Sequence, residues 1–402
     1  MQSNHQLIDY ATGEQERQTE VDMGKTTAKE CIGLDSLLDD IRSRRAEIET
    51  KRHVPRDIVE RLRATGIYRA AVPKSQGGDG APLANVLQLV ERISEADASV
   101  GWVAAFAPQG ANYFGALPSH RLKEIYASGP DVIGAGGLFP LQPVERLEGR
   151  LRVNGRWKFG SGATGADWIS VGIIVPGDGQ PPPPRLLVLP ASKVDIVENW
   201  EVVGLSGTGS HDLVVNNVDA DEDWSFIRGG PVLHDEPICR FPAMALASLS
   251  FAVVGLGAAR AAVQELRALS ATKTSITGAP RLGDRSYIQI GVAKAEIQLQ
   301  AARTFFYDQV DRVWETVTAG NPVDVEAKAV LRLAANHASR AAVSVAEACF
   351  GFSGTTAIFL DNPIQRFLRD ALVVNQHAFL GEGHYESAGR IMLGLPSNPG
   401  FP

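Results

Sequence analysis

Two stretches decide the fold: RLRVNGRWKFGSGATGADW at residues 150–168 and NWEVVGLSGTGSHDLVVNNV at residues 199–218. In both, apolar and polar residues alternate as they do along a half-buried strand, and each contains a turn rich in glycine and serine. Alanine-rich stretches with helical periodicity lie on either side of this pair. The sequence therefore predicts a central β region held by helices against a flat aromatic group.

Composition places the chain among ordinary globular proteins. Its 402 residues suggest two or three compact units, and 44% hydrophobic with 21% charged residues is typical of a soluble protein. A formal net charge of −7 argues against a nucleic-acid partner. No apolar run predicts a transmembrane helix, the N-terminus does not resemble a secretory signal, and three scattered cysteines predict neither disulfides nor a metal site. These features together predict a cytoplasmic enzyme.

The periodicity divides the chain into four regions and predicts an α+β fold. Residues 1–24 are polar without periodicity and are expected to be a mobile tail. Helical spacing predicts a helical domain over residues 25–130, and short Val- and Ile-rich segments predict a β-domain over 131–230. Alanine-rich segments predict a C-terminal helical bundle over 231–402, whose last helix is expected to run from Pro363 to Gly381.

The β-domain is expected to hold six to eight antiparallel strands. The links between its segments are too short for the crossovers that parallel strands need. The VNG sequence at residues 153–155 is expected to form a hairpin turn.

GRWKFGSG, at residues 155–162, is the first candidate binding element. Trp157 and Phe159 lie two apart, so on one strand they would point the same way and form an aromatic wall. The turn formed by Ser161 and its flanking glycines would let backbone N–H groups and a hydroxyl approach a ligand. The alternative is a β-turn whose aromatic residues belong to the core.

GLSGTGS, at residues 204–210, is the second candidate. It leads into another strand rather than a helix, so it offers no helix N-terminus and does not predict a nucleotide phosphate loop. A structural turn and a ligand contact through Trp200 and Thr208 both remain open.

Four motifs occur in order over most of the chain: DASVGWVAAF at 97–106, GRWKFGSGATGADW at 155–168, W-x-x-x-GLSGTGSHDLVV at 200–215 and DNPIQRFLRDALVVNQH at 361–377. With them the chain resembles the acyl-CoA dehydrogenase superfamily across about residues 30–395. It is most similar to the branch of two-component flavin-dependent monooxygenases (group D). The resemblance implies an N-terminal helical domain, a central antiparallel β-barrel-like domain and a C-terminal four-helix bundle.

The resemblance also implies a set of cofactor contacts. Ser161 would lie near flavin N5, and further contacts would come from Trp157, Phe159, Gly162, Trp200, Thr208, Ser353, Gly354 and Thr355, the last three often across a subunit boundary. Arginine recognises phosphate in a bidentate manner, which makes Arg366 and Arg369 candidates for a flavin phosphate, with a salt bridge as the alternative. Lys273 or Arg281 falls where relatives hold a phosphate-binding arginine.

The end of the last motif separates two chemistries. One large branch of the dehydrogenases places a catalytic glutamate at the position of Ala378, and alanine cannot remove a proton. The monooxygenase branch carries a histidine at the position of His377, facing flavin C4a, where an imidazole could hydrogen-bond a peroxide or shuttle a proton. A lone helical histidine with only a packing role is the alternative. His211 is expected to be structural.

The substrate side is predicted from the stretch that follows Trp102. Trp102, Phe106, Gln109 and Tyr113 would suit a flat aromatic ring. Relatives that hydroxylate simple phenols often carry a histidine here, whereas this chain offers Gln109 or Asn112, neither of which is a base near neutral pH. An electron-rich indole- or polyketide-like substrate is therefore expected.

The resulting prediction is a two-component flavin-dependent monooxygenase. A separate NAD(P)H-dependent reductase would supply reduced flavin, either FMNH2 or FADH2. The reduced flavin would react with O2 to form a C4a-hydroperoxyflavin, which would hydroxylate the aromatic ring of the substrate. Charge-poor bundle helices predict a homotetramer like that of relatives. The alternatives are an acyl-CoA dehydrogenase, an N-oxygenase of an amine or amino sugar, and a silent partner subunit.

Overall fold

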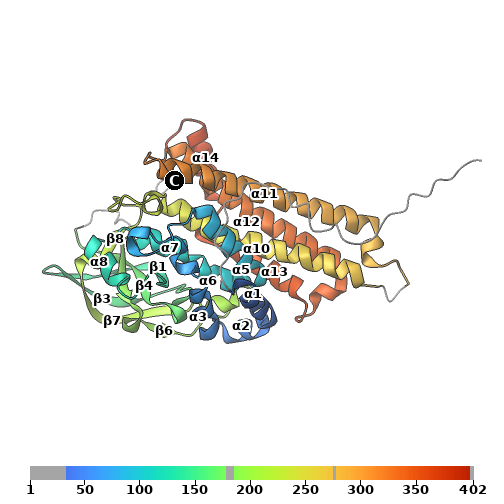
Figure 1. Ribbon diagram of the computed structural model, residues 1–402, viewed down its shortest axis with the longest axis horizontal. Coiled ribbons are helices and arrows are strands. Elements are labelled where there is room, and N and C mark those ends of the chain that lie inside the picture. The colour runs from blue at the N-terminus through green and yellow to red at the C-terminus, as the bar shows by residue number, and fades with distance from the viewer. Residues whose placement is uncertain (1–32, 178–184, 275–277, 399–402) are drawn as a thin grey trace, which may run out of the picture. The chain divides into compact units, whose positions relative to one another are not determined.

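The computed structural model describes residues 33–177, 185–274 and 278–398, so the predicted tail at 1–24 lies outside the described residues. From Gly33 onward the chain forms one compact unit. Helices occupy its first part, strands its middle and longer helices its last part (Figure 1). The division at residues 130 and 230 into domains stays a prediction, because the three parts share this one unit.

The first part consists of short helices with one apolar face each. On the first of them, Leu34, Leu37, Leu38 and Ile41 are buried at helical spacing. The elements are α1 (Leu34–Ser43), α2 (Arg45–Lys51), α3 (Arg56–Ala64), α4 (Ile67–Ala70), η1 (Lys74–Gln76), α5 (Leu83–Ala96), α6 (Ala98–Ala104), α7 (Phe106–Phe114) and α8 (Ser119–Ile125).

The middle part is two four-stranded sheets around one apolar core. One sheet has the order β1-β4-β5-β8 and the other β2-β3-β7-β6. Alternate side chains of both sheets, among them Leu151, Val171, Leu187 and Leu213, meet in the core. The strands are β1 (Gly134–Pro143), β2 (Glu145–Leu147), β3 (Arg150–Trp157), β4 (Trp168–Ile174), β5 (Arg185–Pro190), β6 (Asp195–Val197), β7 (Asp212–Asp221) and β8 (Ser225–Ile227), with short turns η2 (Ala163–Gly165), η3 (Ala191–Lys193), η4 (Ser206–Thr208) and η5 (Glu222–Trp224).

Two expectations about this region are wrong. Strands β1 and β4 pair in parallel, while the other pairs in the described residues are antiparallel. The chain crosses to the second sheet for β2 and β3 before it returns as β4, so these strands serve as the crossover. The VNG sequence forms no turn, because β3 runs through it with a bulge between Val153 and Gly155, and the hairpin turns at Glu148–Gly149 instead.

The last part is a bundle of long helices. Its elements are α9 (Pro237–Arg240), α10 (Ala243–Thr272), η6 (Leu282–Asp284), α11 (Ser286–Thr318), α12 (Val325–Ser353), η7 (Gly354–Ile358), α13 (Pro363–Asn375), η8 (Ala378–Leu380) and α14 (Gly383–Met392). Helix α10 packs on α12, α13 and α5 (Figure 1). Small residues allow this: a Cβ on Gly257 would lie 2.5 Å from the Ser94 Cβ of α5.

Two helices are long and apolar enough to cross a membrane by length and composition alone. In the window within Ala243–Thr272, 94% of the residues are buried inside the fold, as expected for a core helix. In the window within Val325–Ile358, only 39% are buried, which leaves an apolar surface on this side of the bundle.

The predicted last helix is too long. Helix α13 ends at Asn375, and the backbone of His377 is extended, so that its side chain caps the following turn η8. The apolar periodicity of LVVNQHAFL continues past the end of α13, which is why the sequence predicted a single helix. His377 therefore lies in the turn between α13 and η8.

Candidate active site

A cavity of about 520 Å³ lies where the three parts of the chain meet. It is lined by residues of α6 and α7, strand β1, the turn at 158–161, the loop at 200–210, α10 and the turn after α13. The lining is mostly apolar, and its size suits a ring-containing ligand. All four predicted substrate residues, Trp102, Phe106, Gln109 and Tyr113, lie in this lining.

Stacked rings form one wall of the cavity. Trp102 stacks on Phe251 with centroids 4.2 Å apart, and the imidazole of His377 lies 4.3 Å from the ring of Phe251. Phe379 lies 5.0 Å from His377, and Phe106 meets the edge of Phe251 at 5.9 Å. Among the described residues, the buried indole N–H of Trp102 lacks the hydrogen-bond partner that buried N–H groups usually have.

A chain of hydroxyls forms another part of the lining. The Oγ atoms of Ser161 and Ser210 lie 2.6 Å apart, and the Ser210 Oγ lies 2.7 Å from the Thr208 Oγ1. Thr208 also donates to the carbonyl of Leu205 at 2.9 Å. The three side chains are buried and line the cavity, so they present a fixed polar edge within an otherwise apolar surface.

Trp157 and Phe159 do not form the predicted aromatic wall. Trp157 is fully buried in the core between the sheets and donates its indole N–H to the carbonyl of Gly172 at 2.7 Å. Phe159 follows the end of β3 with a left-handed backbone (φ 62°), which breaks the alternation that the sequence argument assumed. Phe159 is 61% exposed and lines the cavity, and its ring meets the ring of Trp200 edge to face with the centroids 6.1 Å apart.

The glycines of the 204–210 loop are needed for packing. A Cβ at Gly204 would lie 2.5 Å from the carbonyl oxygen of Arg369, and one at Gly207 would lie 2.2 Å from Ile48. Gly162 lies outside the cavity lining, with φ 72° and Val103 3.3 Å from where its Cβ would be. The loop is therefore both a structural turn and, through its hydroxyls and Trp200, part of the cavity.

His377 is a neutral group in this environment. Burial among the rings, and then the positive charge of Arg228, lower the pKa of His377 to about 4. Its Nδ1 accepts the backbone N–H of Phe379 at 3.2 Å, so the proton of the neutral ring lies on Nε2. The imidazole can therefore donate a hydrogen bond from Nε2 at neutral pH, but it does not carry a second proton at that pH.

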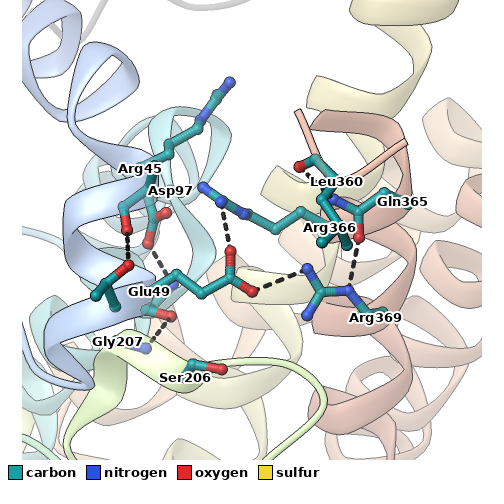
Figure 2. A network of polar contacts seen from close by, with 12 residues as sticks. Arg45, Glu49, Asp97, Ser206, Gly207, Leu360, Gln365, Arg366 and Arg369 are labelled. Atoms are coloured by element: carbon teal, nitrogen blue, oxygen red, sulfur yellow. Dashed lines mark hydrogen bonds and ion pairs between the residues drawn. The ribbon is translucent and has the colours of Figure 1, made fainter. Parts of the chain in front are cut away.

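Arg366 and Arg369 belong to an ion-pair network outside the cavity lining (Figure 2). Glu49 of α2 accepts from Arg366 at 2.5 Å and from Arg369 at 2.9 Å, and Gln365 also accepts from Arg369 at 2.7 Å. The ion pairs of the alternative are therefore present, and the assignment of both arginines to a flavin phosphate stays a prediction. The two guanidinium groups join α13 to α2.

The remaining cofactor candidates form a separate group at the far end of the bundle helices. Lys273 donates to the carbonyl of Ser353 at 2.8 Å and lies 3.9 Å from where a Cβ of Gly354 would be. Gly354 and Thr355 are exposed, whereas Arg281 is paired with Asp284. None of Lys273, Ser353, Gly354 and Thr355 contributes to the cavity lining of this chain.

The two polar residues Gln109 and Asn112 have different surroundings. Gln109 lines the cavity, while Asn112 points away and donates to the carbonyls of Ile238 and Phe241 at 2.7 and 3.1 Å. His211, as predicted, has a structural contact, because its Nδ1 accepts the backbone N–H groups of Asn199 and Trp200.

Phe251, Phe379 and Arg228 are among the cavity residues that sequence reasoning missed. Phe251 is the one aromatic residue of α10, a signal that was present in the sequence. Phe379 follows His377 closely, but its role depends on the turn that ends α13. Arg228 stands before two glycines at the end of the last strand, in a turn closed by Gly230 N–H and Ile227. No sequence pattern indicated that Arg228 would face the cavity.

The chain is similar to proteins of known activity. Residues 36–127 match the family described as "Acyl-CoA dehydrogenase, N-terminal domain" and residues 249–382 match "Acyl-CoA dehydrogenase, C-terminal domain". The indole-3-acetate monooxygenase of Pseudomonas putida is 46% identical over 91% of this chain and 95% of its own. The chain belongs to the flavin-dependent monooxygenases of the acyl-CoA dehydrogenase superfamily.

Two further relatives of this monooxygenase support the same conclusion. The oxygenase component of the FADH2-dependent resorcinol hydroxylase of Rhizobium sp. strain MTP-10005 is 28% identical over 89% of this chain and 92% of its own. The crystal structure of 3-HSA hydroxylase from Rhodococcus sp. RHA1 superposes with a TM-score of 0.86 at 26% identity, covering 92% and 98% of the two chains. The monooxygenase uses reduced flavin and O2, and a separate flavin reductase supplies the reduced flavin.

Proposed function

We propose that this monooxygenase oxygenates the ring of indole-3-acetate or a closely related indole. The wall of stacked rings in the cavity carries the proposal, because Trp102, Phe251 and His377 offer an aromatic surface to a flat bicyclic ring. The similarity to the indole-3-acetate monooxygenase of P. putida supports it. Dehydrogenation of an acyl-CoA is not supported, since the described residues lining the cavity include no Asp or Glu to act as base.

The same cavity fits a reduced flavin. Its hydroxyl edge, the exposed ring of Phe159 with Trp200 beside it, and the unpaired indole N–H of Trp102 suit a flat group with polar edges. We assign Ser161, Thr208, Phe159 and Trp200 to holding it. The reduced flavin, when bound, would supply the two electrons that activate O2, so that one oxygen atom of O2 enters the product and the other becomes water.

The chain's own residues then exclude water and orient both partners. Ser161, fixed by Ser210, would direct its hydroxyl to the polar edge of the flavin ring. His377 would donate a hydrogen bond from Nε2 to an oxygen atom near the substrate ring, and the surrounding rings keep bulk water away from it.

We further propose a homotetramer in which a neighbouring copy completes the flavin site. Three residues after Thr355 begins an apolar run, in which Ile358, Phe359 and Leu360 are 63%, 61% and 83% exposed. Exposed apolar surface of this kind favours a contact between chains. Lys273 and the turn at residues 353–355 would then contact the flavin bound in the cavity of the neighbouring copy. The change Leu360→Glu should reduce the mass measured by analytical ultracentrifugation, whereas an unchanged mass would contradict this interface.

Product analysis tests the proposed reaction. The chain is mixed with an NADH-dependent flavin reductase, FMN or FAD, indole-3-acetate and isotopically labelled oxygen gas, and the product is examined by mass spectrometry. One labelled oxygen atom should appear in the indole product. Absence of label, or turnover of an acyl-CoA with an electron acceptor, would contradict the proposal.

A matched pair of serine variants tests the site. Ser161→Ala should lower kcat/KM about tenfold, because it removes one hydroxyl from the cavity. Ser206→Ala is the control, since Ser206 lies in the neighbouring loop, donates to the carbonyl of Val202 and is absent from the lining. Equal effects of the two changes would remove Ser161 from the site.

A further inference from the structure

Arg228 lines the cavity, and none of the described residues gives it a carboxylate or a hydrogen-bond acceptor. Its guanidinium lies over the ring of Phe379, 5.0 Å from the centroid. Its Nε is buried and forms no hydrogen bond, and no ion pair to Arg228 exists within the part of the chain that the structure describes. A half-buried guanidinium without an acceptor is costly, so a ligand that accepts hydrogen bonds would be stabilised beside the part of Arg228 that lines the cavity.

The cavity as a whole favours an anion. Arg228 and Lys158 are its basic lining residues, and the described lining includes no Asp or Glu. The positive charge of Arg228 affects two neighbouring groups. Burial is the first cause and the charge of Arg228 the second cause that lower the pKa of His377 to about 4 and the pKa of Arg332 to about 10. A negative charge brought into the cavity would meet attraction and no competing carboxylate.

The position of Arg228 relative to the ring wall matches one kind of substrate. Phe379, under the guanidinium, lies 5.0 Å from His377, which in turn lies 4.3 Å from Phe251. A flat ring against His377 and Phe251 would therefore have Arg228 within reach of a short acidic arm. The guanidinium is a planar fork of donors that matches a carboxylate in a bidentate manner.

We propose that Arg228 binds the carboxylate of the substrate and makes the enzyme select an aromatic acid over its neutral analogue. This inference rests on the proposed function, because it assumes that the ring of the same substrate lies against the aromatic wall. Arg228 lies in the turn that the Gly230 N–H closes on the carbonyl of Ile227, and within this turn Gly229 has a φ of 73°, the left-handed conformation that favours glycine. The selectivity thus depends on a side chain at the end of the last strand.

Binding without turnover tests the inference directly. The chain loaded with reduced flavin is titrated without oxygen, by calorimetry, with indole-3-acetate, with indole-3-acetamide and with indole. The acetate should bind about 10- to 100-fold more tightly than the amide, which has nearly the same shape without the charge. Equal affinities for the acetate and the amide would overturn the inference.

Variants of the arginine separate recognition of charge from a packing role. Arg228→Gln should remove the preference for the acetate while the affinity for indole stays within about twofold. Arg228→Lys should keep part of the preference, because the charge remains but the planar fork is lost. Arg240→Gln is the control: Arg240 pairs with Asp235, lies outside this lining and should not alter either affinity. Equal weakening of acetate and indole by Arg228→Gln would show a packing role.

Oxygenation assays distinguish the two proposals. If indole is oxygenated without any advantage for the acid, the proposed function stands and the role of Arg228 is wrong. If the acid binds with the expected preference but no labelled oxygen enters any indole, the carboxylate site stands and the proposed function is wrong.

Discussion

Helix α13 and the turn after it take part in two regions of opposite character. At the cavity, Gln376 and His377 lie among rings, and the buried Trp102 Nε1 and Arg228 Nε atoms have no hydrogen-bond partner in the described residues. At the junction of α2, α6, α13 and the 204–210 loop, arginines and carboxylates bind one another (Figure 2). The arginines of the junction have a carboxylate beside them, whereas the described lining of the cavity offers Arg228 none, so an acidic ligand is expected there.

The junction also shows why arginine in a motif is an ambiguous signal. Arg366 and Arg228 carry the same functional group, yet Arg366 has Glu49 beside it and Arg228 has no carboxylate. The acidic partner of Arg366 comes from a helix more than three hundred residues earlier in the chain. The role of each arginine is therefore decided by what the fold brings next to it.

The largest effect is expected from removing the centre of the ring wall. Phe251→Ala should lower the free energy of unfolding by about 3 kcal/mol, because a buried ring that contacts Trp102 and His377 is lost. Chemical denaturation followed by fluorescence measures this. Binding of indole should weaken as well, and retention of full indole affinity would separate the ring wall from the substrate.

Breaking the junction should have the next largest effect. Glu49→Ala leaves two partly buried guanidinium groups without their carboxylate and should lower the free energy of unfolding by roughly 2 kcal/mol. Glu60→Ala, which removes an exposed carboxylate from surface pairs with Arg56 and Arg63, is the control and should cost below about 1 kcal/mol. If Arg366→Gln weakens flavin binding without loss of stability, Arg366 instead binds the flavin.

The junction should also give stability a pH dependence. Burial, and then the nearby charge of Asp97, raise the pKa of Asp370 to about 7. Because this folded-state pKa lies above the unfolded value, the stabilising contribution is present below the unfolded pKa and is lost as pH rises through about 7. The wild type should lose about 1 kcal/mol of stability between pH 6 and pH 8 relative to Asp370→Asn. Parallel stability curves for the two proteins would contradict this assignment.

The smallest effect is expected from titration of His377. Its folded-state pKa is depressed to about 4, so any stability it contributes is present above the unfolded value and lost as pH falls through about 4. The pH profile of kcat/KM should therefore show no step near pH 6.5 from this residue. Arg228→Gln should raise the pKa of His377, which NMR titration of the histidine would detect; an unchanged pKa would show that the charge of Arg228 does not reach the ring.

Sequence alone was sufficient for the elements that depend on local pattern. The apolar spacing of Leu34, Leu37, Leu38 and Ile41 predicts the face that α1 buries, and the glycine-rich turns predict where strands end, because both signals act within a few residues. The four motifs likewise identified the family, and they placed Trp102, Phe106, Ser161 and His377 in a resemblance that the cavity now brings together.

Only the tertiary structure decided which side chains face the cavity. The left-handed backbone at Phe159 turns its ring away from the side that Trp157 faces, and the end of α13 at Asn375 moves His377 into a turn. Neither Glu49 beside Arg366 nor the lack of a carboxylate beside Arg228 is written in a local pattern. Charge pairing and burial depend on contacts between distant segments, and only the folded chain specifies those contacts.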